Sequence, residues 1–154
     1  MSTTVRKAIE QDLDELACLF DSYRQFYELT PDAELARQFI KDRFTKNDSV
    51  ILVAVDERFS CIGFCQMYPT YCSLVAKPIY TLYDIFVHLD ARERGIGRQL
   101  LVAAQNRSVA DGMARMDLTT AKNNVTAQSL YSSLGWVRDD VFYTYSWHPQ
   151  ARES

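Results

Sequence analysis

The sequence has few residues of the kinds that bind metals or form disulfides. Its 154 residues include four cysteines, with no Cys-x-x-Cys pair, and two histidines, His88 and His148. Zinc sites in proteins need several cysteine, histidine or carboxylate ligands, so this composition predicts no metal site. A chain of this length can build a core without disulfides, and we expect the cysteines at positions 18, 61, 65 and 72 to be free thiols.

A long apolar run and an excess of basic residues are also missing. No segment approaches the roughly 18 apolar residues of a membrane span, and the N-terminus does not resemble a signal peptide. The 17 lysine and arginine residues are outnumbered by 20 aspartate and glutamate residues, which gives a net charge of -3. Such a chain has no broad positive field for nucleic acid or anionic lipid. We expect a cytoplasmic protein that binds neither nucleic acid nor membranes.

Composition and length predict one folded domain. Hydrophobic residues make up 47% of the chain and charged residues 24%, which excludes a disordered protein. The length suits a single core. We expect residues 1–148 to form this domain and residues 149–154 to be a loose tail.

Apolar periodicity predicts alternating strands and helices. The predicted helices span residues 13–27, 31–44, 96–109 and 125–134, with Thr30 capping the second helix and Pro31 as its first residue. The predicted strands span residues 5–9, 49–55, 61–68, 79–87, 115–120, 136–137 and 141–147, with Pro69 ending the third. This order predicts an α/β fold, a mixed sheet of about six to seven strands flanked by about four helices.

Residues 87–98 join a predicted strand to a predicted helix and carry two glycines and three arginines. Gly95 and Gly97 allow backbone N–H groups of the first helical turn to point at one anion, and the helix dipole favours negative charge there. The side chains of Arg92, Arg94 and Arg98 can neutralise phosphate oxygens. The segment therefore predicts a pyrophosphate site, although a plain turn before a helix also explains the glycines. Leu100 replaces the third glycine of a Rossmann loop, and no Walker sequence occurs.

The same segment resembles the Arg/Gln-x-x-Gly-x-Gly/Ala signature of the GCN5-related N-acetyltransferase (GNAT) superfamily. Downstream, the run from Asn124 to Trp136 resembles the family's Asn-x-x-Ala-x-x-x-Tyr-x-x-x-Gly-Phe block. The resemblance implies the GNAT acyl-CoA N-acyltransferase fold, with a mostly antiparallel sheet, and acetyl-CoA or coenzyme A as co-substrate without a metal. The cofactor-binding residues that it implies are Phe86, Val87, Arg92, Arg94, Gly95, Ile96, Gly97, Arg98, Asn124, Ala127 and Tyr131.

The resemblance also implies two catalytic groups. The backbone amide of Val87 would hydrogen-bond the thioester carbonyl as charge builds on its oxygen. Tyr131 would protonate the departing thiolate, since a tyrosine pKa near ~10 suits a thiol near ~8.5. Alternatively, Tyr131 packs its ring in the core, and Asn124 either bonds the pantetheine amides or caps its helix.

Asp84 is the candidate for handling the acceptor amine. It is the one acid in an apolar and aromatic strand, so burial should raise its pKa. The segment resembles diamine and spermidine acetyltransferases, which have Glu-Asp where this chain has Tyr83-Asp84. The alternatives for Asp84 are that it anchors an ammonium group, accepts its proton directly or through a water chain, or is a structural acid bonded to backbone amides.

Aromatic residues predict an acceptor pocket or an interface. Tyr23, Tyr27 and Tyr83, together with Asp84, are the predicted substrate-binding residues, because aromatic faces attract cations. Phe26, Tyr68, Tyr71 and Tyr80 are further candidates, and we expect at least half of these aromatic residues to be core or dimer contacts. The predicted last strand, residues 141–147, can pair across a homodimer.

These features together predict an acetyl-CoA-dependent N-acetyltransferase. We expect the acceptor to be a small primary amine, a polyamine or an amino acid, which attacks directly in a ternary complex. The alternatives are a catalytically silent acyl-CoA-binding or regulatory module, and a peptide or protein N-acetyltransferase. An acidic chain suits a cationic acceptor better than an acidic one.

Overall fold

The structure is a computed structural model that describes residues 2–150. One five-stranded sheet has the order β1 (Thr4–Lys7), β2 (Val50–Val55), β3 (Cys61–Cys72), β4 (Lys77–Val87) and β5 (Met116–Asp117). The first four strands are antiparallel neighbours, and β5 runs parallel to β4. The predicted mixed, mostly antiparallel sheet is therefore confirmed, with fewer strands than expected.

Four α-helices and two 3-10 turns complete the secondary structure of the described residues. They are η1 (Glu10–Asp12), α1 (Leu13–Phe26), α2 (Ala33–Lys46), η2 (Leu89–Ala91), α3 (Ile96–Ala110) and α4 (Val125–Ser133). The chain forms two compact units that meet between Thr119 and Thr120, and each is described by itself. The expected single domain stays a prediction.

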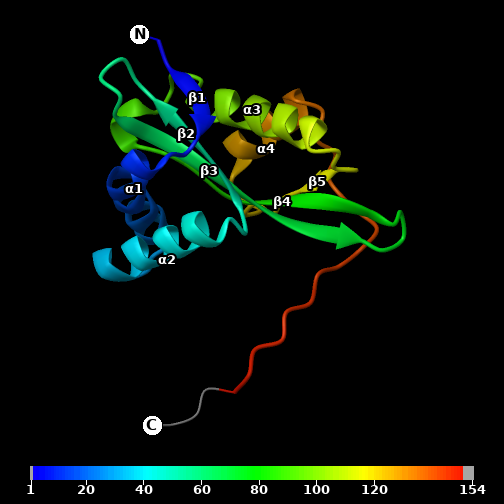
Figure 1. Ribbon diagram of the computed structural model, residues 1–154. Helices are drawn as coiled ribbons and strands as arrows, with labels where there is room; N and C mark the ends of the chain where they lie inside the picture. Colours follow the sequence, from blue (N-terminus) through cyan, green and yellow to red (C-terminus); the bar gives the residue numbers. More distant parts are fainter. Residues whose placement is uncertain (1, 151–154) are drawn as a thin grey trace. The chain divides into compact units, whose positions relative to one another are not determined.

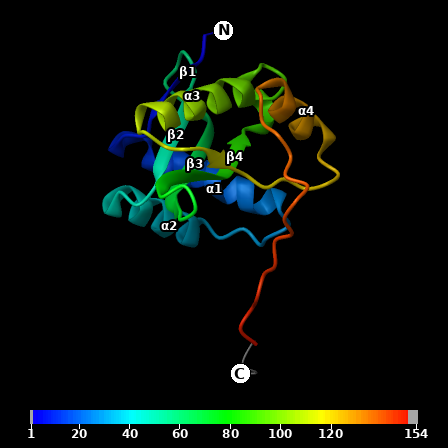
Figure 2. The same ribbon diagram turned by 90° about the vertical axis from the view of Figure 1, so that its right-hand side faces the viewer.

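In the first unit, helices cover both faces of the sheet. Figures 1 and 2 show α3 on one face and α1 with α2 on the other. All six residues of β2 are buried, as expected for a central strand covered on both sides. The core between the sheet and the α1–α2 layer is built by alternate strand residues and by the apolar stripes of the two helices; it includes Leu16, Phe20, Ile40, Val53, Phe64 and Phe86.

Several predicted boundaries are corrected by the structure. Helix α2 begins at Ala33 because Asp32, rather than Thr30, caps it: the Asp32 carboxylate accepts a hydrogen bond from Leu35 N at 3.1 Å. Strand β3 continues through Pro69 to Cys72. The β2 ladder ends at Met67, so beyond it β3 has an open edge that can accommodate a proline.

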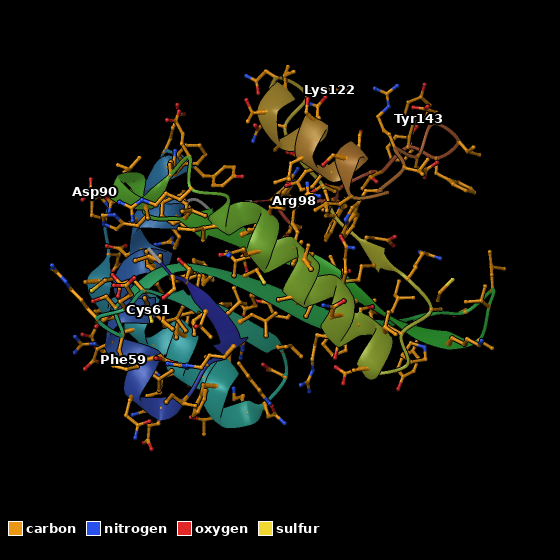
Figure 3. The ribbon with its side chains drawn as sticks, turned by 90° about the horizontal axis from the view of Figure 1, so that it is seen from above. Phe59, Cys61, Asp90, Arg98, Lys122 and Tyr143 are labelled. Atoms are coloured by element: carbon orange, nitrogen blue, oxygen red, sulfur yellow. The ribbon has the colours of Figure 1, made fainter. Side chains whose placement is uncertain are left out.

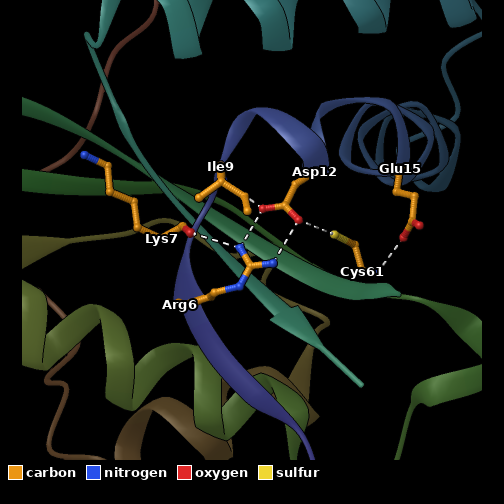
Figure 4. Close-up of polar contacts among 6 residues, drawn as sticks. All are labelled: Arg6, Lys7, Ile9, Asp12, Glu15 and Cys61. Carbon is orange, nitrogen blue, oxygen red and sulfur yellow. Dashed lines mark hydrogen bonds and ion pairs between the residues drawn. The ribbon is translucent and has the colours of Figure 1, made fainter. Parts of the chain in front are cut away.

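A partly buried ion pair joins β1 to the turn before α1 (Figure 4). Arg6 donates to both carboxylate oxygens of Asp12, at 2.7 and 3.0 Å, and Ile9 N donates to the same carboxylate at 2.8 Å. Burial by itself would raise the pKa of Asp12, but these donors hold it below its ordinary value. Nearby, Glu15 accepts a hydrogen bond from Cys61 N at 2.7 Å, which ties α1 to the start of β3.

The second unit contains α4 followed by a chain without regular secondary structure. Residues 136–150 form no helix or strand, so the strands predicted at 136–137 and 141–147 are absent. The alternating aromatic pattern is typical of a strand, but a strand also needs a neighbour to pair with, and no ladder includes this segment within residues 2–150. Its side chains are exposed, including Phe142, Tyr143, Tyr145 and Trp147. Of the predicted loose tail, residues 149 and 150 lack regular structure, and residues 151–154 lie outside the described residues.

No helix within residues 2–150 combines the length and the apolar composition required to cross a bilayer.

Candidate active site

A β-bulge in β4 determines which face Asp84 occupies. Gln66 of β3 pairs with Asp84, but the next residue, Met67, pairs with Leu82, so Tyr83 is an extra residue in β4. Neighbouring residues of a strand point to opposite faces, and the bulge therefore places Leu82 and Asp84 on opposite faces despite their spacing of two. Asp84 is 6% exposed and Tyr83 is 69% exposed. The bulge thus buries the acid and leaves the tyrosine beside it at the surface.

The Asp84 carboxylate is held by a chain of buried side chains. Gln66 Nε2 donates to Asp84 Oδ2 at 2.9 Å, and Ser49 Oγ donates to Gln66 Oε1 at 2.7 Å. All three residues are buried. We call Ser49, Gln66, Asp84 and Tyr23 the acid cluster. Sequence reasoning missed Gln66, although one amide in the otherwise apolar run from Cys61 to Met67 is the same kind of signal that identified Asp84.

Tyr23 brings α1 to the acid cluster. Its hydroxyl donates to the carbonyl oxygen of Tyr83 at 3.4 Å and lies near the Asp84 carboxylate. Its ring packs edge-on against Phe64 and Phe86, with ring centroids 5.8 and 5.9 Å away. Burial, and then the neighbouring Asp84 charge, raise the pKa of Tyr23 far above its ordinary value, so the hydroxyl stays protonated and acts as a donor.

The pKa of Asp84 reflects two opposing effects. Burial raises it above its ordinary value, while the hydrogen bonds from Gln66 and Tyr23 favour the charged form and lower it; burial dominates. Tyr68, half-buried on β3, has its pKa raised to about 12 by burial and then by the Asp84 charge. The sequence predicts that burial raises the pKa of Asp84, and the structure agrees. The hydrogen bond to its carboxylate comes from a side chain, that of Gln66.

The structure brings the predicted acceptor residues together. The ring of Tyr23 lies 5.2 Å from that of Tyr27, and the ring of Tyr83 lies 5.7 Å from that of Tyr68. Tyr27 is 56% exposed, so the group opens to the surface on the side of Tyr27 and Tyr83. Tyr80 does not belong to it: its hydroxyl donates to Asp111 at the end of α3.

The hydrogen-bond pattern of β4 leaves the Val87 amide available. His88 N donates to Ile62 O at 2.8 Å. Val87, the residue before His88, is paired with Gly63. Because bonded and non-bonded pairs alternate along an antiparallel ladder, the N–H of Val87 points away from β3. On that other side, the described β4–β5 ladder pairs Tyr80 with Met116 and Thr81 with Asp117, well before Val87. The geometry fits the predicted oxyanion donor.

The segment from His88 to Gly95, here called the glycine loop, leads from β4 into α3. Gly95 adopts a left-handed conformation with φ 73°, which favours glycine, and α3 starts at the next residue. A side chain at Gly63 would meet Phe86 O at 3.1 Å and Ile96 at 3.4 Å, so the bare backbone there lets the first turn of α3 pack closely on β3. Figure 3 shows Asp90 in the loop and Arg98 in the first turn of α3. The first N–H groups of a helix have no partner within it and can bind an anion.

The predicted phosphate-binding arginines differ in their surroundings. Arg94 Nη2 donates to Asp90 O at 3.3 Å within the loop. Arg92 Nε donates to Val87 O at 3.2 Å, and its guanidinium carbon lies 5.3 Å from the ring centre of Phe26 and 5.4 Å from that of Phe86. Arg92 therefore links the glycine loop to the aromatic end of α1, a contact that the sequence pattern did not reveal. The Phe86 side chain is buried in the core, so its backbone is the part available to a ligand.

The remaining predicted residues lie in the second unit. Asn124 Oδ1 accepts a hydrogen bond from Ala127 N at 3.2 Å, which makes Asn124 the cap of α4. The ring of Tyr131 lies 6.1 Å from that of Trp136, and Trp136 N donates to Tyr131 O at 3.0 Å. The roles of Asn124, Ala127 and Tyr131 toward a cofactor stay predictions. Residues 2–150 contain no cluster of three or more His, Cys, Asp or Glu side chains able to hold a metal ion, and the expectation of a metal-free site is likewise untested.

Comparisons with known proteins address the family of this chain. The family model described as "Acetyltransferase (GNAT) family" matches residues 13–136. The chain is 40% identical over 141 residues, covering 92% of its length and 94% of the relative, to an uncharacterised N-acetyltransferase, YhfO, of Bacillus subtilis (strain 168). It is 30% identical over 105 residues, covering 68% of its length and 40% of the relative, to the L-ornithine N5-acetyltransferase NATA1 of Arabidopsis thaliana.

A solved structure extends the agreement to the fold. The crystal structure of a probable acetyltransferase superposes with a TM-score of 0.90 at 34% identity, covering 97% of this chain and 99% of that one. The family match spans α1, strands β2 to β5, the glycine loop and α4, which include the elements that carry the predicted site. The chain belongs to the acetyltransferase (GNAT) family and is an acetyltransferase.

Proposed function

We propose that this protein transfers the acetyl group of acetyl-CoA to the primary amine of a small cationic acceptor, by direct attack in a ternary complex. The observation that carries the proposal is the placement of a buried carboxylate three residues before an available strand amide. At roughly 3.3 Å per residue, the backbones of Asp84 and Val87 lie about 10 Å apart along β4. That span leaves room for an amine, with or without a water molecule, between the acid and the reacting carbonyl.

The glycine loop supports binding of coenzyme A. The N-terminal amides of α3, which follow Gly95, and the arginines at positions 94 and 98 suit a pyrophosphate. The N–H of Val87, at the end of β4, suits the oxygen of the thioester carbonyl, where negative charge grows during attack. Tyr131 is proposed to return a proton to the thiolate that leaves, and Asn124 to bond the pantetheine arm.

The acid cluster supports a cationic acceptor. An alkylammonium group has a pKa near ~10.4 and must lose a proton before it can attack. Asp84 is buried near the aromatic residues Tyr23, Tyr68 and Tyr83, a setting in which its carboxylate favours an ammonium group. Its raised pKa also makes it a better proton acceptor than an exposed aspartate. The ornithine-acetylating relative acts on an amino acid with two amines, and we infer that this protein also uses a small acceptor with more than one polar group.

Release of free thiol from acetyl-CoA tests this proposal. The panel consists of polyamines, aminoglycosides, amino acids of both hands and lysine peptides, with heat-treated protein as the blank. We expect thiol release that depends on the added amine, together with calorimetric binding of acetyl-CoA. Binding without thiol release for any amine would instead support a silent acyl-CoA-binding module, and preference for peptides would support protein acetylation. Absence of binding to acetyl-CoA and coenzyme A would overturn the proposal.

The proposed homodimer is a separate matter. The exposed aromatic side chains from Val141 to Trp147 are the surface that supports it. Light scattering after size-exclusion chromatography, on the full chain and on a chain ending before residue 141, measures it directly.

A further inference from the structure

The buried glutamine behind Asp84 is bonded at both ends of its amide. Gln66 is fully buried, and its Nε2 donates to Asp84 while its Oε1 accepts from Ser49. The opposite amide orientation would place Oε1 against the Asp84 carboxylate, which has no proton to donate when charged. The Asp84 carboxylate therefore selects the orientation of the Gln66 amide, and the Ser49 hydroxyl, which can donate or accept, satisfies its other end.

The three side chains come from three neighbouring segments of the sheet. Gln66 and Asp84 are directly opposite each other on β3 and β4, and Ser49 immediately precedes β2. The bulge at Tyr83 sets the register that brings Asp84 onto the face of Gln66. The hydrogen bond from Gln66 therefore holds the Asp84 carboxylate from the neighbouring strand. It uses Oδ2 and leaves Oδ1 for partners other than Gln66.

We propose that Gln66, with the other end of its amide bonded to Ser49, is a positioning residue that holds the Asp84 carboxylate charged and aimed at the acceptor amine. The inference rests on the proposed function for the role of the amine. The geometry of the chain from Ser49 to Asp84 does not depend on it. In this arrangement, Gln66 supplies a hydrogen bond to the charged form of a group whose charged form burial disfavours.

The other groups that face Asp84 do not replace this donor. The Tyr23 hydroxyl of α1 donates to the Tyr83 carbonyl oxygen at 3.4 Å, and the rings of Tyr68 and Tyr83 lie 5.7 Å apart. Cys65, the neighbour of Gln66 on β3, is buried with its pKa raised to about 12 and is a neutral thiol. Arg43 of α2 lies near Tyr68 but is paired with Asp48 at 2.9 Å. Within residues 2–150, no lysine, arginine or histidine forms an ion pair with Asp84.

The sign of the effect follows from the charge state. Removing the Gln66 donor leaves burial unchanged and removes a bond to the charged form, so the pKa of Asp84 must rise further. The acidic limb of the pH profile of kcat/KM then moves to higher pH. A hydrogen bond to a charged group corresponds to a shift of roughly one pH unit.

The test compares Gln66→Met with Gln38→Met. Gln38 also donates to an aspartate, Asp42 at 2.9 Å, but on the exposed face of α2, so it controls for loss of an amide–carboxylate bond outside the site. The readouts are the pH profile of kcat/KM and a ¹³C NMR titration of the Asp84 carboxyl in the free protein, with Asp84→Asn to identify its signal. We expect the acidic limb and the titration to shift upward by roughly one unit in Gln66→Met only.

A second pair of variants avoids a large change in the core. Ser49→Ala removes the hydroxyl that bonds the far end of the Gln66 amide, and Ser49→Thr keeps a hydroxyl; we expect a smaller upward shift of the Asp84 titration in the first variant and none in the second. An Asp84 titration that is unchanged in Gln66→Met and in Ser49→Ala would overturn the inference. A shifted titration in a protein that acetylates no amine would confirm the positioning role and reject the proposed function.

Discussion

The acid cluster and the glycine loop handle opposite charges by different means. Asp84 in the acid cluster is buried, and its carboxylate accepts a hydrogen bond from Gln66 of β3, whose amide is bonded in turn by Ser49. The glycine loop is exposed, and its capacity for an anion lies in backbone N–H groups at the start of α3. A charge that binds a cation in a low dielectric needs neutral donors to remain charged, whereas a helix N-terminus keeps its partial charge at any pH. The two regions should therefore respond to different perturbations.

The largest expected effect is the loss of the acid itself. Asp84→Asn keeps the size of the side chain and can still accept the hydrogen bond from Gln66, but it removes the negative charge. We expect kcat/KM for the amine to fall at least about 100-fold, because the group that anchors or deprotonates the ammonium is gone. Affinity for coenzyme A, measured by calorimetry, should be unchanged. Turnover within a few-fold of wild type would assign Asp84 a structural role only.

A smaller effect is expected in the glycine loop. Gly95 and Gly112 both have φ 73°, and a Cβ at either position would meet nothing within 4 Å. Alanine at either end of α3 should therefore carry the same backbone strain, about 1–2 kcal/mol, and lower the Tm by roughly 2–8 °C. Only Gly95→Ala should weaken binding of coenzyme A, by about tenfold, with the KM of the amine little changed. Equal affinities for coenzyme A in the two variants would remove the loop from the proposed cofactor site.

The two regions also differ in how far the sequence reveals them. The glycine loop is local: its strand end, glycines and helix start are consecutive, so the turn and its anion-binding capacity could be predicted. Asp84 could be identified as the acid of an apolar strand, but its contact with Gln66 depends on the register of β3 against β4 and on the bulge at Tyr83. The bulge cannot be predicted from strand periodicity, because its extra residue reverses the alternation of side chains between the two faces of the sheet.

Non-local packing explains the other differences. The stacking of Arg92 on Phe26 requires the end of α1 to lie beside the glycine loop, a contact between residues that are far apart in the sequence. The aromatic pattern of residues 141–147 predicts a strand, but the structure has none there. Such a pattern indicates that a segment can form a strand, and it does not indicate whether a neighbouring strand is present to pair with it. Contacts between separate helices, strands and loops are therefore the features that the sequence predicts least well and the structure adds.

The smallest expected effect concerns stability and separates the regions by pH. Because the pKa of Asp84 is raised on folding, the folded state binds a proton more tightly than the unfolded state, and stability falls as pH rises from about 3.9 through the folded-state pKa. Asp84→Asn removes this loss. We expect its free energy of unfolding to exceed that of wild type at pH 7, with the difference vanishing near pH ~3, where Asp84 is protonated in both states.

Gly95→Ala contains no altered titrating group, so its loss of unfolding free energy relative to wild type should be the same at every pH. Denaturant unfolding of the three proteins at several pH values measures both differences, and a deficit of Gly95→Ala that varies with pH would show that the glycine loop and the acid cluster are coupled.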